Sequence, residues 1–289
     1  MGKIVVIGSG PAGCSAALYA ARAGMEVTVI SMGAGALQKA EMIQNYYGFK
    51  AGISGAELYR RGVAGAEAVG AKFVTAEVVG LDYTATLVVQ TTAGDYPADA
   101  VILATGTGRL APKIAGLTEH EGHGVSYCAT CDAFFYRGKT AAVLGSGEYA
   151  LHEVQALLPL AGRVLLCTNG EPLTAEFPAA VEVYPEKLAA VVGEPNVTAL
   201  RLQGGELLPV DGLFVALGTA GSAALARKLG APLRADGRIA VDEKQQTGIP
   251  GLYAAGDCTG GMLQVCKAVY EGALAATEAI KMLRGKKNN

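Results

Sequence analysis

The chain has 289 residues, and 24 Lys and Arg residues against 26 Asp and Glu residues give a net charge of −2. Its 40 glycines are about twice the ordinary usage, and 51% of the residues are apolar. This composition excludes a disordered or fibrous chain and is sufficient for two hydrophobic cores. A charge this close to zero provides no basic field, so we expect no nucleic-acid partner.

The N-terminal residues do not resemble a targeting segment. A single lysine leads into a short apolar run and a glycine turn, without a basic region or a cleavage site. No run of 18 apolar residues occurs, so we expect no membrane span and a cytoplasmic protein. Six cysteines in that compartment do not make a disulfide framework, so any disulfide should be catalytic.

The first elements along the chain predict a strand–helix–strand unit. Residues 3–7 predict a strand, residues 11–24 a helix that Gly24 ends, and residues 27–30 a second strand. This order is typical of a parallel, doubly wound sheet. After a loop-and-helix stretch, three short runs predict an antiparallel meander: 72–79, 86–92 and 100–103.

The same order of elements then repeats. The repeat consists of a strand, a turn, a helix, a strand and a second meander, over 140–144, 145–147, 148–160, 163–167 and 197–218. A helix near 263–283 has no partner in this second copy, so we assign it to the first. The predicted fold class is α/β, with two Rossmann-like, three-layer nucleotide-binding domains, each with a meander. The predicted domains are 1–114 with 243–289, and an inserted domain over 115–242.

A glycine-rich motif, GSGPAG, lies between the first predicted strand and helix. Its residues 8–13 permit a tight turn, approach of backbone amides to a pyrophosphate, and close helix packing. The sequence therefore predicts a dinucleotide site. Ser31 replaces the acid that often holds a ribose, so ribose recognition should be weaker or made elsewhere.

A second glycine turn, GSGEYA at 145–150, is less convincing as a dinucleotide site. Glu148 places a negative charge where a pyrophosphate would bind. Residues 168–170, after the second strand, provide neither an acid for a ribose nor an arginine pair for a 2′-phosphate. We favour the interpretation that this turn keeps the packing of a nucleotide-binding fold but binds no nicotinamide cofactor. NADH binding stays open as the alternative.

The segment Cys128-Ala129-Thr130-Cys131 carries direct chemistry. Two cysteines at this spacing can cycle between dithiol and disulfide. Half of a zinc site is the alternative, but His120 and His123 do not complete it at a usual spacing, so we expect no metal. Asp132 could transfer a proton to or from a thiolate, or be a turn carboxylate. The other cysteines are interpreted as structural: Cys14, Cys167, Cys258 and Cys266.

Together these segments resemble the low-molecular-weight thioredoxin reductases over essentially the whole chain. The matching segments are GSGPAG, QNYYGF with Asn45, ILATG at 102–106, SYCATCDAFFYRGK at 126–139, YAAGD at 253–257 and Gln264. The resemblance implies FAD in the first domain, a homodimer and thioredoxin as the partner. It implies that Cys131 faces the flavin, Cys128 exchanges with the partner's disulfide, and Asp132 is the acid. The FAD-binding residues that it implies, with those of the glycine motif, are Gly8, Ser9, Gly10, Pro11, Ala12, Gly13, Ser31, Gly35, Ala36, Leu37, Asn45, Val78, Ala104, Thr105, Gly106, Gly256, Asp257, Gln264 and Val265.

Departures from the family pattern concern the electron donor. The residues Thr168–Gly170 stand where NADPH-dependent members have His-Arg-Arg, Leu263 replaces a usual Arg, and Ala36 replaces a usual Gln. With its shortened second domain, the chain is similar to the ferredoxin-dependent flavin thioredoxin reductases of anaerobic bacteria, which implies ferredoxin as the donor. C-terminal cations could steer an acidic ferredoxin, although we favour a role in complementing the helix dipole: Lys281, Arg284, Lys286 and Lys287.

We therefore expect ferredoxin to reduce FAD, FAD to reduce the Cys128–Cys131 disulfide, and thioredoxin to be reduced through a mixed disulfide. A rotation of the domains about linkers near 113–116 and 242–246 is expected as well. An NADH-dependent reductase is the main alternative, and an NADPH-dependent one fits less well. An O₂-dependent dithiol oxidase and a flavin-binding sensor or scaffold also stay open.

Overall fold

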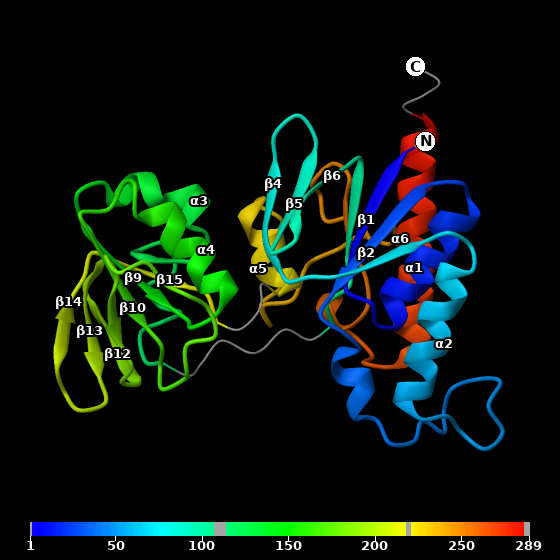
Figure 1. Ribbon diagram of the computed structural model, residues 1–289, viewed down its shortest axis with the longest axis horizontal. Coiled ribbons are helices and arrows are strands. Elements are labelled where there is room, and N and C mark those ends of the chain that lie inside the picture. The colour runs from blue at the N-terminus through cyan, green and yellow to red at the C-terminus, as the bar shows by residue number, and fades with distance from the viewer. Residues whose placement is uncertain (1, 107–113, 218–220, 286–289) are drawn as a thin grey trace. The chain divides into compact units, whose positions relative to one another are not determined.

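A computed structural model describes residues 2–106, 114–217 and 221–285 (Figure 1). The chain forms two compact units. The first unit consists of Met1–Gly108 and Gly221–Asn289, and the second unit is Arg109–Ala220.

The first unit is built on a five-stranded parallel sheet in the order β16-β7-β1-β2-β3. Its strands are β1 (Lys3–Ile7), β2 (Glu26–Ser31), β3 (Lys72–Thr75), β7 (Ala100–Leu103) and β16 (Leu252–Ala254). The helices are α1 (Pro11–Arg22), α2 (Gly55–Glu67), α5 (Ser222–Lys228) and α6 (Val265–Gly285). The strand–helix–strand unit of the sequence prediction is confirmed, and Gly24, at φ +80°, follows the end of α1.

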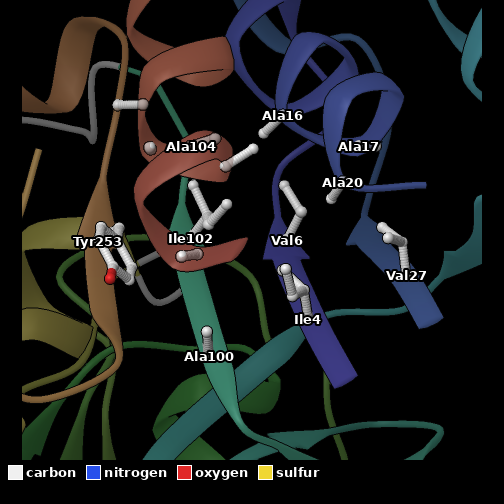
Figure 2. Close-up of a cluster of buried hydrophobic side chains, with 14 of the residues drawn as sticks. Ile4, Val6, Ala16, Ala17, Ala20, Val27, Ala100, Ile102, Ala104 and Tyr253 are labelled. Carbon is white, nitrogen blue, oxygen red and sulfur yellow. The ribbon is translucent and has the colours of Figure 1, made fainter. Parts of the chain in front are cut away.

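Small helix residues against branched strand residues make the core of the first unit. Figure 2 shows Ala16, Ala17 and Ala20 of α1 lying over Val6 and its sheet neighbours. Helix α6 packs on α1 so closely that a Cβ at Gly272 would lie 2.0 Å from the carbonyl oxygen of Ala12. This close packing fixes the start of α6 relative to the glycine-rich loop.

The meander of the first unit is β4 (Val78–Tyr83), β5 (Leu87–Thr91) and β6 (Gly94–Ala98), paired antiparallel. The predicted meander was wrong at both ends. Residues 72–75 are the edge strand β3, and residues 100–103 are β7, inside the parallel sheet. The physical reason is burial: all four residues of β7 are buried, as expected for a parallel strand covered on both faces.

The second unit repeats the plan, with a parallel sheet in the order β11-β10-β9-β15-β8 and a meander in the order β12-β13-β14. The strands are β8 (Val125–Ser126), β9 (Thr140–Leu144), β10 (Arg163–Cys167), β11 (Glu182–Tyr184), β12 (Leu188–Gly193), β13 (Val197–Leu202), β14 (Leu207–Pro209) and β15 (Gly212–Val215). The helices are α3 (Ala129–Asp132), η2 (Ala133–Tyr136) and α4 (Glu148–Leu157). The predicted α/β class with two Rossmann-like units is confirmed, although β15 belongs to the parallel sheet and not to the meander.

The second unit ends at Ala220, before the predicted boundary at residue 242. Helix α5 belongs to the first unit because the backbone N–H of Ser222 donates to Thr105 Oγ1 at 3.0 Å. Residues 242–246, predicted as a linker, form a turn in the first unit in which the Asp242 carboxylate accepts the N–H groups of Lys244 and Gln246. The other predicted linker is 113–116, and its first residue lies outside the described residues.

The last helix, α6, carries the C-terminal cations. Lys281 pairs with Glu278 at 2.6 Å, and Arg284 donates to the carbonyl of Ala23 at 2.9 Å. Lys286 and Lys287 lie outside the described residues. Across the described ranges, no helix has both the length and the apolar character that a bilayer crossing requires.

Candidate functional site

A cavity of about 620 Å³ lies in the first unit, where β1, β7 and β16 end. Its wall is made by the loops that follow these strands, by the segment from Gly33 to Asn45, which includes η1 (Gly35–Lys39), and by the start of α6. The carboxyl ends of parallel strands are the usual ligand-binding edge of doubly wound sheets. The first unit therefore carries a pre-formed ligand cavity.

The glycine-rich loop has two kinds of glycine. Gly8 has φ +106°, and a Cβ there would lie 2.4 Å from the carbonyl oxygen of Ala104. A Cβ at Gly13 would lie 1.8 Å from the carbonyl oxygen of Gly8. A Cβ at Gly10, which lines the cavity, would meet no described atom within 4 Å. Packing thus requires glycine at positions 8 and 13, whereas Gly10 leaves open space on the cavity side.

Hydrogen bonds tie the cavity wall together. Asn45 Nδ2 donates to Gln264 Oε1 at 2.9 Å, which joins the loop after η1 to the residue preceding α6. Thr105 Oγ1 lies 2.7 Å from Ser222 Oγ. Asp257, at the start of η3 (Asp257–Thr259), also lines the cavity, and burial raises the pKa of its carboxyl group.

Ser31 is held by a hydroxyl network beside the cavity. Ser9 Oγ lies 2.6 Å from Ser31 Oγ and 3.1 Å from the hydroxyl of Tyr59 on α2. Ser9 is buried and lines the cavity, whereas Ser31 is not part of the cavity wall. The hydroxyl that replaces the usual acid thus contacts the glycine-rich loop.

The cysteine motif of the second unit lies at the start of the short helix α3, which begins directly after Cys128. Cys128 is buried and disulfide-bonded, and the side chain of Cys131 is outside the described part of the chain. The backbone N–H of Cys128 donates to Ser126 Oγ at 3.1 Å, and this hydroxyl donates to Asp132 Oδ2 at 2.7 Å. Ser126 therefore links the backbone of Cys128 to the carboxylate of Asp132.

A buried carboxylate that we did not predict lies beside this motif. Glu153 on α4 is fully buried, accepts the backbone N–H of Ala129, and has Oε1 3.3 Å from His152 Nδ1. Its sequence signal is the spacing from Tyr149 to Glu153 to Leu157, which puts a charge on the apolar face of α4.

The second glycine turn is covered by the chain's own backbone and side chain. The N–H of Thr174 donates to the carbonyl of Ser146 at 2.8 Å, and Thr174 Oγ1 lies 3.0 Å from the position of a Cβ on Gly147. After β10, Asn169 has φ +56° and accepts the N–H of Leu188 at 2.9 Å. Thr174 and Asn169 thus form their hydrogen bonds with other residues of the second unit.

Three of the other four cysteines, Cys14, Cys167 and Cys258, are buried and do not resemble reactive thiols. Burial raises the pKa of Cys14 and Cys167 to about 12 and that of Cys258 to about 11, while Cys266 is exposed and free. His120 contacts two carbonyl oxygens through its ring nitrogens. Among the described residues, no group of three or more His, Cys, Asp and Glu side chains could hold a metal ion.

Comparison with known proteins defines the family. The model of the family described as pyridine nucleotide-disulphide oxidoreductase matches residues 2–272. The chain belongs to this family. It is 33% identical to the thioredoxin reductase of Aquifex aeolicus, over 98% of this chain and 94% of that protein.

Solved structures of thioredoxin reductases match this chain over almost its entire length. An atypical thioredoxin reductase from Desulfovibrio vulgaris Hildenborough is 39% identical with a TM-score of 0.91, covering 99% of both chains. A ferredoxin-flavin thioredoxin reductase from Clostridium acetobutylicum is 33% identical with a TM-score of 0.75, covering 98% of both chains. Thioredoxin reductases of this family are FAD flavoproteins, so FAD is the cofactor implied for this chain.

The residues of the cavity fit such a dinucleotide, because Gly10 leaves room at the glycine-rich loop and the strand ends open onto one space. The structure brings most of the predicted FAD-binding residues to its wall: Gly8, Ser9, Gly10, Pro11, Ala12, Gly35, Ala36, Leu37, Asn45, Ala104, Thr105, Gly106, Gly256, Asp257, Gln264 and Val265. Gly13, Ser31 and Val78 lie outside the wall, and the contact of any of these residues with FAD stays a prediction.

Other residues of the wall were not predicted as family contacts: Gly33, Ala34, Ala40, Met42, Ile43, Gln44, Ala255, Leu263 and Ala268. Four of them directly flank a predicted residue: Ala34, Gln44, Ala255 and Leu263. Those between Ala40 and Gln44 lie in irregular backbone, where no periodic pattern marks the side that faces a ligand.

Proposed function

We propose that this family member is a thioredoxin reductase that takes its electrons from reduced ferredoxin. FAD occupies the cavity of the first unit, and Cys128 with Cys131 forms the disulfide that is reduced and then reduces thioredoxin. The observation that carries the proposal is the disulfide-bonded Cys128 held through Ser126 next to the carboxylate of Asp132. The thioredoxin reductases among its relatives support the choice of substrate.

Bound FAD would supply the ability to accept electrons one at a time and to deliver two to a disulfide. In the reduced protein, the Cys128 thiolate attacks the disulfide of thioredoxin, and a mixed disulfide forms as one thioredoxin sulfur leaves. Cys131 then attacks Cys128, which releases thioredoxin as a dithiol and restores the internal disulfide. Two electrons and two protons pass to thioredoxin in each cycle, so two one-electron ferredoxins are oxidised. Asp132 supplies a proton to the departing thiolate.

Residues around the second glycine turn favour a donor other than a nicotinamide cofactor. The second glycine of such a turn normally leaves space for a pyrophosphate. Here Thr174 lies against Gly147 at that point, and Glu148 adds a negative charge at the start of α4. Asn169, where the family places a phosphate-binding residue, is bonded to the backbone of Leu188. The name of the Clostridium acetobutylicum relative supports ferredoxin as the donor.

Exposed aromatic side chains beside the cysteine motif favour a protein substrate. Phe134 and Phe135 of η2 are 66% and 67% exposed, and their ring centroids lie 6.2 Å apart. Exposed apolar groups of this size often mark protein-binding surfaces. Cys128 itself is buried, so exchange with a protein requires a conformational change that exposes its sulfur.

The direct test replaces Cys128 by serine. Cys128→Ser should abolish thioredoxin reduction and leave the bound flavin spectrum in place, because the cavity residues belong to the other unit. Cys266→Ser is the matched control: this exposed free cysteine should be dispensable for reduction of thioredoxin. Full activity of the Cys128 variant, or loss of its FAD, would refute the assigned roles.

A further inference from the structure

Asp257 lies in a loop whose flanking glycines have an unusual backbone conformation. Gly256 has φ 84° and ψ −152°, and Gly260 has φ 85° and ψ −156°. Only glycine adopts this region readily, and such conformations persist where the surrounding structure enforces them. Because Gly256 and Asp257 line the cavity, the contacts that hold this loop also hold part of the cavity wall.

The ammonium group of Lys267 on α6 contacts both glycines. Lys267 Nζ donates to the carbonyl oxygens of Gly256 at 2.8 Å and Gly260 at 2.5 Å, and to Thr259 Oγ1 at 3.0 Å. One cation thus bonds to both ends of the segment that presents Asp257.

Glu271, one helical turn further on, completes the arrangement. Its Oε2 accepts the N–H of Gly256 at 2.8 Å and the hydroxyl of Thr259 at 3.0 Å, and lies 2.9 Å from Lys267 Nζ. The two charged side chains are 13% and 12% exposed, so water screens the pair far less than a surface ion pair. The N–H and the C=O of Gly256 are both held by this pair.

Helix α6, which carries Lys267 and Glu271, lines the cavity near its start and packs closely on α1. Val265 and Ala268 near its start line the same cavity, and Gly272 packs against Ala12 of α1. The loop is therefore fixed relative to the helix that forms part of the cofactor cavity and to the helix that follows the glycine-rich loop.

We propose that Lys267 and Glu271 are positioning residues for FAD. They hold the Gly256–Gly260 loop in its glycine-only conformation, so that the Asp257 carboxylate stands in the cavity before the cofactor binds. Affinity gained in this way comes from preorganisation, because the loop does not have to be ordered during binding. The inference rests on the proposed FAD site and adds residues that would not touch the cofactor themselves.

The test measures FAD affinity of the apoprotein by quenching of flavin fluorescence. The Lys267→Met and Glu271→Gln variants should each bind FAD about tenfold more weakly, or worse, because the loop is no longer held. Lys267→Arg, which retains the charge and several donors, should recover part of the affinity. Lys281→Met, which breaks the exposed Lys281–Glu278 pair on the same helix, is the matched control and should bind FAD like the wild type.

A double-variant cycle separates positioning from a general effect on folding. If Lys267 acts through Asp257, adding Lys267→Met to Asp257→Asn should weaken FAD binding by less than about threefold further. Additive losses, or lowered apoprotein melting temperature with unchanged FAD affinity, would overturn the inference. A wild-type apoprotein that binds no FAD would instead refute the proposed cofactor site itself.

Discussion

At the residue scale, the glycine-rich loop has one glycine that packing requires and one that we expect ligand binding to require. A Cβ at Gly8 would lie 2.4 Å from the carbonyl oxygen of Ala104, whereas a Cβ at Gly10, which lines the cavity, would meet no described atom within 4 Å. We predict that Gly8→Ala destabilises the protein by roughly 2–4 kcal/mol, from overpacking and positive φ. Gly10→Ala should cost less than about 1 kcal/mol but weaken FAD binding.

Urea unfolding of both apoproteins and titration with FAD distinguish the two positions. Unfolding midpoints that fall equally, with equal FAD affinities, would contradict the separation of roles.

Asp257 gives a prediction for pH dependence. Burial raises the pKa of its carboxyl group above the ordinary 3.8, so the folded state binds this proton more tightly than the unfolded chain. The stability contributed by the protonated form is present below pH 3.8 and is lost as the pH rises through the raised pKa. At neutral pH the ionised carboxylate therefore opposes folding of the apoprotein.

The variant Asp257→Asn should consequently unfold at higher urea than the wild-type apoprotein at pH 7, and the difference should shrink as the pH is lowered toward the raised pKa. The same variant should bind FAD more weakly. A difference that grows on acidification would show that the sign is wrong.

At the element scale, local signals located the strands and helices on either side of the two glycine-rich turns, but they did not indicate the short helix α3 of the cysteine motif. Strands β9 and β10 have the predicted bounds, because short apolar runs between a glycine turn and a helix leave little choice. Strands β7 and β15 were wrongly placed in meanders, because the sequence alone does not show which apolar run enters the parallel sheet. That choice depends on pairing with β1 and β9, distant in the chain.

Helix α2 offers a test of such a local signal. Ser54 precedes the helix, and its hydroxyl accepts the N–H of Glu57 at 3.2 Å. Ser54→Ala should cost about 1 kcal/mol of stability, while Ser54→Asp, which keeps an acceptor at the helix start, should cost less. Thermal unfolding of the two variants measures the difference, and equal losses would argue against the cap.

At the scale of the whole molecule, the two units could be predicted but their boundary could not. Residues 221–242 join the first unit through partners far away in the chain, such as Thr105, whose hydroxyl oxygen accepts the backbone N–H of Ser222, 117 residues later. The cofactor cavity could be predicted where motifs are contiguous, whereas the Lys267–Glu271 pair depends on how α6 meets a loop. The homodimer stays a proposal that rests on the resemblance alone, and the cytoplasmic location stays a prediction from the N-terminal residues and the absence of a long apolar run.

The electron donor is the central claim about the whole molecule, and one anaerobic experiment tests it directly. NADPH, NADH and reduced ferredoxin are added separately to the FAD-loaded protein while the visible flavin absorbance is followed. Oxidised thioredoxin is then added. We predict fast bleaching by ferredoxin alone, with the colour restored by thioredoxin; fast bleaching by either nicotinamide would contradict the interpretation of Thr174, Glu148 and the missing arginines.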